Sequence, residues 1–173
     1  DTLSTFAQKT QSDLSVIASD TTDMEMLILN HRTAPNVPVA NAVRMSMSIP
    51  FIWQEVVWQG AWGNYRGRSK EGNIVVDGGV LSNFPIRLIA TTDDEVREIM
   101  GDTDPEGAGN LGLMIDEKIA VPGAADTPKT PLPVTQLRSV QRISRLVDTM
   151  KGSADNEMIR RFRKDICCLP AKG

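Results

Sequence analysis

The most informative part of this 173-residue chain is Gly72-Asn73-Ile74-Val75-Val76-Asp77-Gly78-Gly79-Val80-Leu81-Ser82-Asn83-Phe84-Pro85. Its short apolar run is typical of a buried strand and ends on the acidic residue Asp77. The glycines that follow, Gly78 and Gly79, permit backbone angles and close approaches that other residues do not. We therefore expect a strand that holds the Asp77 carboxylate at the carboxyl edge of a sheet, where open α/β sheets bind ligands.

A helix is expected to open near Phe84, just after this turn. Ser82 or Asn83 could cap such a helix, and Pro85 suits a first helical turn. The spacing alone also fits a purely structural turn that ends in an acid, because short motifs often match by accident.

The remainder of the chain alternates apolar runs with helical patterns. Strands are expected at residues 14–19, 24–30, 55–58, 111–116 and 166–169, and helices at 38–47, 93–100, 137–150 and 154–164. Residues 117–134 contain four prolines and are expected to form a long loop or linker. Strands separated by helices predict an α/β fold built in layers. Without an internal repeat or a convincing second domain, residues 1–173 are interpreted as part of a single domain.

In the helix expected from Pro38 onward, the apolar residues that fall near one face are Val39, Ala42, Val43 and Met47. We expect this face to be the buried one.

Composition excludes some classes of function. The net charge of −3 argues against general nucleic-acid binding, which usually needs a basic surface. No apolar run approaches the length that spans a bilayer, and the polar first residues do not resemble a signal peptide. The adjacent Cys167 and Cys168 could form only a strained bridge, so we expect two reduced, buried thiols. Reduced thiols weakly favour an intracellular compartment.

Three segments in order resemble the second half of patatin-like lipid acyl hydrolases. They are Val16-Ile17-Ala18-Ser19-Asp20-Thr21-Thr22, Ser46-Met47-Ser48-Ile49-Pro50, and Asp77-Gly78-Gly79-Val80-Leu81-Ser82-Asn83-Phe84-Pro85. The family carries an apolar strand ending in an Ala-Thr-Asp-type turn, a Ser-x-Ser-Ile-Pro-like segment, and Asp-Gly-Gly or Asp-Gly-Ala followed by a Leu-x-Asn-x-Pro-like tail. The resemblance covers roughly residues 14–90. It implies a three-layer α/β/α sandwich, here partial.

The resemblance also implies a serine–aspartate dyad that cleaves acyl esters of phospholipids or neutral lipids such as acylglycerols. Asp77 is the implied catalytic aspartate, and Gly78 and Gly79 shape its turn. A serine would form an acyl-enzyme that water then releases, while Asp77 accepts or steers the serine proton without a histidine. The implied chemistry needs no metal or other cofactor.

The family's serine lies in Gly-x-Ser-x-Gly, and this sequence contains no such motif; its glycine-rich oxyanion segment is also missing. Both precede the aspartate in the family. We therefore expect this chain to be a carboxyl-terminal portion, with the nucleophile on a missing or separate N-terminal segment. A non-catalytic lipid-binding or regulatory module on the same fold is the alternative.

The tryptophans and the only tyrosine cluster just before a group of cations. These residues are Trp53, Trp58, Trp62, Tyr65, Arg66, Arg68 and Lys70. Aromatic rings beside cations suit a lipid–water boundary, where cations meet phosphate. Large aromatics are also mostly buried, so packing in the core is an equal alternative. The first alternative implies transient binding to a membrane surface, and we expect a cytoplasmic protein peripheral to membranes.

His31 is the only histidine and falls in a loop between Asn30 and Arg32. Core or loop packing is the favoured interpretation for it, because a catalytic triad is recognised by geometry and not by sequence. One histidine and two adjacent cysteines do not supply the spaced ligands of a zinc site.

Overall fold

The computed structural model describes residues 1–82, 84–91, 93–102, 109–123, 157 and 159–172. The chain divides into two compact units. Unit 1 comprises Asp1–Asn83 and Asp93–Gly101, and unit 2 comprises Phe84–Thr92 and Asp102–Gly173.

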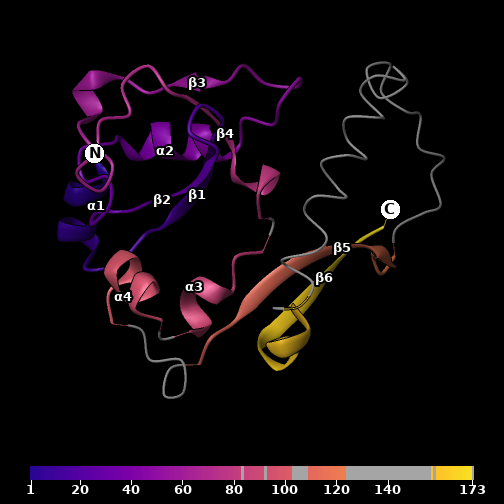
Figure 1. Cartoon of the computed structure of the whole chain (residues 1–173). Helices are drawn as coiled ribbons and strands as arrows, with labels where there is room; N and C mark the ends of the chain where they lie inside the picture. Colours follow the sequence, from indigo (N-terminus) through magenta and orange to yellow (C-terminus); the bar gives the residue numbers. More distant parts are fainter. Residues whose placement is uncertain (83, 92, 103–108, 124–156, 158, 173) are drawn as a thin grey trace. The chain divides into compact units, whose positions relative to one another are not determined.

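A four-stranded sheet forms the centre of unit 1 (Figure 1). Its strands are β1 (Val16–Asp20), β2 (Glu25–Leu29), β3 (Val56–Val57) and β4 (Ile74–Asp77). They lie in the order β2-β1-β4-β3, and every neighbouring pair is antiparallel. Since β1 runs antiparallel to both β2 and β4, the carboxyl ends of β2 and β4 lie at the same edge of the sheet. All four strands coincide with predicted ones.

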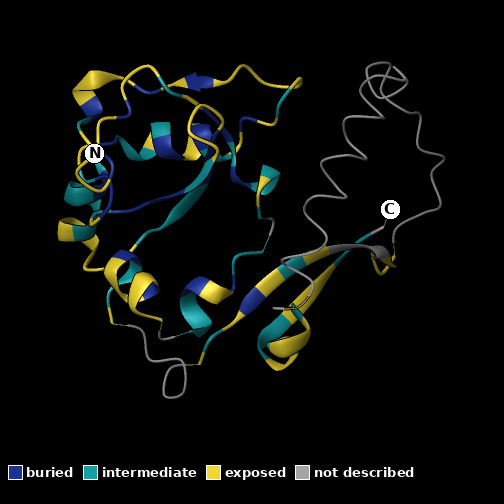
Figure 2. Ribbon diagram, viewed as in Figure 1, coloured by how far each residue is buried: buried dark blue, intermediate teal, exposed yellow. Residues whose placement is uncertain are grey.

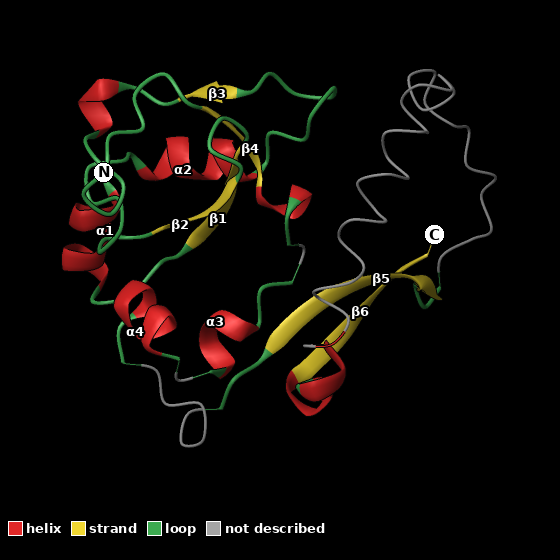
Figure 3. Cartoon of the chain, in the orientation of Figure 1, coloured by secondary structure: helices red, strands yellow, loops and turns green. Residues whose placement is uncertain are grey.

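Three α-helices belong to unit 1: α1 (Leu3–Thr10), α2 (Val39–Ser46) and α4 (Asp94–Met100), shown in red in Figure 3. Helix α1 begins at a capping box, in which the Thr2 side chain accepts from Thr5 N and the Thr5 side chain accepts from Thr2 N. Helix α2 packs against β1 and β4. Short 3₁₀ turns are η1 (Gly60–Trp62) and η2 (Gly78–Val80).

The buried face of α2 agrees only in part with the predicted one. Ala42 and Met45 are fully buried, whereas Val43 and Met47 are exposed. Ala42 and Met45 are three residues apart and thus share a face, and the helix turns this face to the sheet. The prediction was correct for Ala42 and for Val39, which packs partly buried against the core, and wrong for Val43 and Met47.

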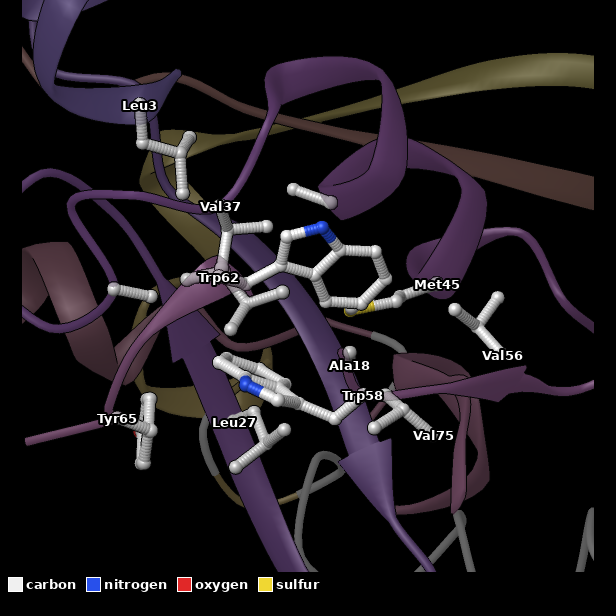
Figure 4. Close-up of a cluster of buried hydrophobic side chains, with 13 residues drawn as sticks. Leu3, Ala18, Leu27, Val37, Met45, Val56, Trp58, Trp62, Tyr65 and Val75 are labelled. Atoms are coloured by element: carbon white, nitrogen blue, oxygen red, sulfur yellow. The ribbon is translucent and has the colours of Figure 1, made fainter. Parts of the chain in front are cut away.

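The core of unit 1 draws on segments from the whole length of residues 3–75 (Figure 4). Its largest members are two aromatic residues, Trp58 and Trp62, whose rings meet edge to face with centroids 5.9 Å apart. The labelled neighbours in Figure 4 are Leu3, Ala18, Leu27, Val37, Met45, Val56, Tyr65 and Val75. The core therefore joins α1, α2, the sheet and the loop before β4.

Unit 2 contains α3 (Arg87–Ala90), η4 (Arg163–Asp165) and a two-stranded parallel sheet of β5 (Gly112–Ala120) and β6 (Ile166–Lys172). Strand β5 continues through residues 117–120, which were expected to be loop. The ring of Phe84 packs closely on Gly112, where an added Cβ would lie 2.6 Å from Phe84 Cζ.

Two further expectations for this part of the chain are wrong. Cys167 and Cys168 are free thiols as predicted, but both are exposed, because neighbours in a strand face opposite sides and the sheet has two strands within the described residues. Helix α3 begins later than expected, after Ile86, and has no side-chain cap. Instead, the 3₁₀ turn η2 follows directly on Asp77.

The predicted helix at 137–150 and residues 124–134 of the proline-rich segment lie outside the described residues. The secondary structure is mixed α/β, as predicted. Of the helices in the described part of the chain, none is long and apolar enough to cross a bilayer.

Candidate active site

Asp77 is the last residue of β4, as predicted, and two hydrogen bonds hold it there. Its backbone N–H donates to the carbonyl oxygen of Ser48 (3.0 Å). Its carboxylate oxygen Oδ1 accepts from Gly79 N–H (2.6 Å), so that Asp77 caps the short turn η2. Within the described part of the chain, Oδ2 has no hydrogen-bond donor. The side chain is half-buried.

Strand register shows on which face of the sheet this residue lies. Asp77 pairs with Ala18, and Ala18 pairs with Leu27 on its other side. Residues directly opposite in antiparallel strands point to the same face. Asp77 therefore lies on the face that α2 covers, at the carboxyl edge beyond the buried Val75.

Gly78 is required here because of close packing. A Cβ at this position would lie 2.5 Å from the carbonyl oxygen of Ile17 and 2.7 Å from its carbonyl carbon. No side chain fits at such distances from backbone atoms. Gly79 contributes differently, through the backbone N–H that fixes the Asp77 carboxylate.

The Ser46–Pro50 segment meets the aspartate turn through Ser48. This serine is buried, and its hydroxyl donates to the carbonyl oxygen of Arg44 (2.6 Å), which closes the end of α2. Its own carbonyl receives the N–H of Asp77. Two of the three segments that the sequence singled out are thus in direct contact, and the third, β1, is the strand paired with β4.

Lys70 forms a buried ion cluster at the opposite edge of the sheet. Its ammonium group contacts three carboxylates: Asp20 Oδ2 (3.0 Å), Asp23 Oδ2 (2.5 Å) and Glu25 Oε1. Asn73 donates to Asp20 Oδ2 (2.8 Å) and Asp23 Oδ2 (2.9 Å). The three carboxylates are close enough to hold a metal ion, but the Lys70 ammonium already lies between them and supplies the compensating positive charge.

This cluster shifts the pKa of each of its members. Burial alone would raise the pKa of Asp20, but hydrogen bonds from Asn73, the Asp23 backbone and Lys70 outweigh it and lower the pKa below 3.8. Hydrogen bonds from Lys70 and Asn73 lower the pKa of Asp23.

The pKa of Glu25 is likewise lowered, because Lys70 and Arg68 outweigh the effect of burial. For Lys70, burial works to lower the pKa, but the three carboxylates raise it above its ordinary value of 10.5. The cluster is therefore fully ionised at neutral pH.

Most of the aromatic residues proposed for a lipid interface lie in the core instead. Trp58, Trp62 and Tyr65 are buried. The indole N–H of Trp58 donates to Gly63 O (3.0 Å), and the Tyr65 hydroxyl accepts from Ile28 N–H (3.2 Å). For these three the core alternative holds, because each ring lies in the apolar core and the polar atoms of Trp58 and Tyr65 have hydrogen-bond partners. Trp53 is exposed.

The cations of the same loop are engaged in ion pairs. Arg66 Nη2 lies 2.8 Å from Glu98 Oε2, and Arg68 Nη2 lies 3.1 Å from Glu25 Oε2. With Lys70 inside its cluster, all three cations face carboxylates of the protein itself. Sequence reasoning missed these pairs because their partners are 32 to 50 residues distant in the chain, and no local pattern indicates such contacts.

His31 follows the carboxyl end of β2, at the same edge of the sheet as Asp77. Its Nδ1 lies 3.2 Å from Asp13 Oδ1. The neighbouring Arg32 also contacts Asp13, through Nη1 and Oδ2 (3.0 Å). The histidine thus belongs to a small loop cluster with Asp13, and its expected non-catalytic role stays a prediction.

Comparison with known proteins agrees with the resemblance in the sequence. The family model described as patatin-like phospholipase matches residues 1–90. A protein of Bacillus subtilis (strain 168) described as "Uncharacterized protein YqhO" is 38% identical over 104 residues, which are 57% of this chain and 32% of that protein. The chain thus spans about a third of the length of this curated relative. No solved structure matches the chain.

Proposed function

The chain belongs to the patatin-like phospholipase family, and we propose that it supplies the aspartate of a serine–aspartate dyad that hydrolyses acyl esters of lipids. Phospholipids or acylglycerols are the proposed substrates. The observation that carries the proposal is the arrangement of Asp77, whose backbone and one carboxylate oxygen are held while Oδ2 has no donor among the described residues.

The proposed reaction is acyl transfer in two steps. A serine hydroxyl attacks the ester carbonyl carbon and its proton passes to Asp77. The ester C–O bond then breaks, and Asp77 returns the proton to the leaving alcohol as the acyl-enzyme forms. A water molecule then attacks the acyl-enzyme, again with Asp77 as the base, and releases the fatty acid. Oδ2 is the oxygen that we expect to face the serine.

Rigid placement supports this role. A general base must lie within hydrogen-bond reach of the proton that it accepts. The bond from Gly79 N–H fixes the rotation of the Asp77 side chain, and the bond to Ser48 fixes the end of the strand. The close contact of Gly78 with Ile17 prevents the turn from shifting.

The proposal extends beyond this sequence. The nucleophilic serine would lie in a Gly-x-Ser-x-Gly motif on a segment before residue 1, and with it the sheet would complete a three-layer α/β/α sandwich in which residues 1–173 are the carboxyl-terminal part of one domain. The protein would act in the cytoplasm at the periphery of membranes, without a metal or other cofactor.

Replacing the carboxylate tests the dyad. In the full-length protein, Asp77→Asn removes the base and is expected to lower the rate of hydrolysis of a monomeric short-chain ester by about 10²–10⁴-fold. Asp102→Asn, the same change at an exposed aspartate of unit 2, is the matched control and keeps the wild-type rate. Wild-type turnover by Asp77→Asn would rule out Asp77 as the base.

A fluorophosphonate that labels activated serines tests the other member of the dyad. We expect one labelled serine in the full-length protein, within a Gly-x-Ser-x-Gly sequence. No labelling together with binding to lipid vesicles and no ester turnover would favour the alternative, a non-catalytic lipid-binding module.

A further inference from the structure

The segment between α2 and β3 exposes several large apolar side chains that lie close together in the sequence. We call Met47, Ile49, Phe51, Ile52 and Trp53 the apolar tip; each is between 45% and 69% exposed. Figure 2 shows this segment as an exposed loop. Single exposed apolar residues are common on protein surfaces, but five within seven positions mark an interaction surface.

We propose that the apolar tip docks the protein on a lipid surface composed of zwitterionic or uncharged lipids. This inference rests on the proposed function, because a lipid substrate makes a bilayer the expected partner. It replaces the interface predicted from the sequence, of which only Trp53 remains.

The charges around the tip favour an uncharged surface. No ionisable residue occurs between Met45 and Gln54, and the residues that flank this stretch, Arg44 and Glu55, carry opposite charges. The cations at positions 66, 68 and 70, which the sequence analysis grouped with Trp53, are paired with carboxylates. Attraction to anionic headgroups would need free cations, so binding must come mainly from burial of the tip's apolar side chains.

The backbone of the tip is suited to a site with little water. The N–H groups of Ile52 and Trp53 both donate to Ile49 O (3.1 and 3.0 Å), and Ile49 N–H donates to Met47 O (2.9 Å). These bonds close a compact turn, so that several backbone polar groups do not need water as a partner. Phe51 occupies the left-handed region with a φ of 69°, as expected for a defined turn and not for an extended strand.

A backbone hydrogen bond also connects the tip segment directly to the candidate catalytic residue, Asp77. Ser48 lies within the tip segment, and its carbonyl oxygen accepts the N–H of Asp77. Docking through this loop would therefore bring the acyl chains of the bilayer near the carboxyl end of β4.

Partition into phosphatidylcholine vesicles tests the proposal. The full-length protein in the Asp77→Asn background is used, so that hydrolysis does not consume the lipid. Ile52→Gln should weaken partition roughly tenfold, because a buried aliphatic side chain is lost. Met24→Gln, at another exposed apolar residue of unit 1, is the control and should leave partition unchanged. Equal effects of the two variants would overturn the proposal.

Two further measurements separate the tip from other modes of binding. Brominated phosphatidylcholine should quench the fluorescence of Trp53, and Trp53→Phe should abolish this quenching; quenching that persists in Trp53→Phe contradicts the proposal.

Raising the salt concentration from 50 to 500 mM should change partition less than about twofold. A tenfold loss in high salt would mean that charges and not the tip bind the membrane.

Self-association is the competing explanation for an exposed apolar loop. A dimer in sedimentation without lipid, converted to a monomer by Ile52→Gln, would overturn the lipid proposal. The docking surface and the dyad can be rejected separately. A protein that hydrolyses the monomeric ester but does not bind vesicles rejects only the docking surface. A protein that binds vesicles but does not hydrolyse the ester rejects only the dyad.

Discussion

Gly78 illustrates how a single residue controls the geometry of the candidate site. Its missing side chain lets the turn after β4 approach the carbonyl of Ile17 in the neighbouring strand. Asp77, the residue before this glycine, donates its backbone N–H to the carbonyl oxygen of Ser48 and accepts the N–H of Gly79 at its carboxylate. Movement of the turn would therefore displace the carboxylate directly.

Gly78→Ala is expected to lower the free energy of unfolding by about 1–3 kcal/mol, because the new methyl group overlaps backbone atoms that cannot move away. Urea denaturation of the full-length protein measures the change. Gly109→Ala is the matched control: an added Cβ there meets nothing within 4 Å. Equal stability of the two variants would show that the contact with Ile17 relaxes without cost.

Between elements, the Lys70 cluster joins the β1–β2 turn to the loop before β4. Asp20 and Lys70 are both almost completely buried, and the lysine reaches across 50 positions of the sequence to the aspartate. Removing one partner of a buried ion pair leaves the other charge uncompensated, which costs about 3–5 kcal/mol. The cluster therefore ties the amino-terminal end of β4 to the hairpin while η2 holds its carboxyl end.

The pH dependence of stability follows from this cluster. The three carboxylates have lowered pKa values in the folded protein. Their contribution to the free energy of unfolding is therefore complete above the ordinary pKa values of 3.8–4.5, and it is lost as the pH falls through the lower pKa values of the folded state. Because the pKa of Lys70 is raised, its contribution to the free energy of unfolding is complete below pH 10.5 and is lost as the pH rises further. Urea denaturation should therefore show a plateau between about pH 5 and pH 10.

Lys70→Met is the variant that checks this explanation. It should lower the free energy of unfolding at pH 7 by about 3 kcal/mol, the lower end of the expected range, because Asn73 still donates to Asp20. The deficit should shrink below pH 4.5 as the carboxylates become protonated. A deficit that is constant from pH 3 to pH 7 would contradict the assignment.

On the scale of the whole molecule, all residues of the candidate site lie in unit 1, where most of the family match of residues 1–90 also lies. The stability of this unit depends on a core in which Trp58 is the largest fully buried side chain. That core brings together residues from α1, the sheet and the loop of 58–65.

Truncation of Trp58 should destabilise the protein strongly, whereas truncation of Trp53 should have little effect. Trp58→Ala should lower the free energy of unfolding by about 3–5 kcal/mol, because it leaves a large cavity. Trp53→Ala should change it by less than about 0.5 kcal/mol, because the ring is exposed. Thermal unfolding of the two variants measures both effects, and similar losses would mean that Trp53 is also part of the core.

Local sequence patterns predicted the elements well. The runs that became β1, β2, β3 and β4 show the apolar composition of buried strands, and the segment 74–79 predicted both the end of β4 and its acidic residue. These predictions succeed because strand formation and the turn after Asp77 depend mainly on neighbouring residues. The contact between Ser48 and Asp77 was not predictable from spacing, since it depends on how α2 packs against the sheet.

The strands, the turn at Asp77 and the family could be read from the amino-acid sequence, because they follow from residue type and from short ordered motifs. Which aromatic rings are buried and which cations are paired became clear from the folded structure alone. Those outcomes depend on contacts between residues tens of positions apart: Lys70 meets Asp20, and Trp58 packs with residues of the sheet. A side chain's environment is set by such distant partners, whereas its local conformation is set by its neighbours.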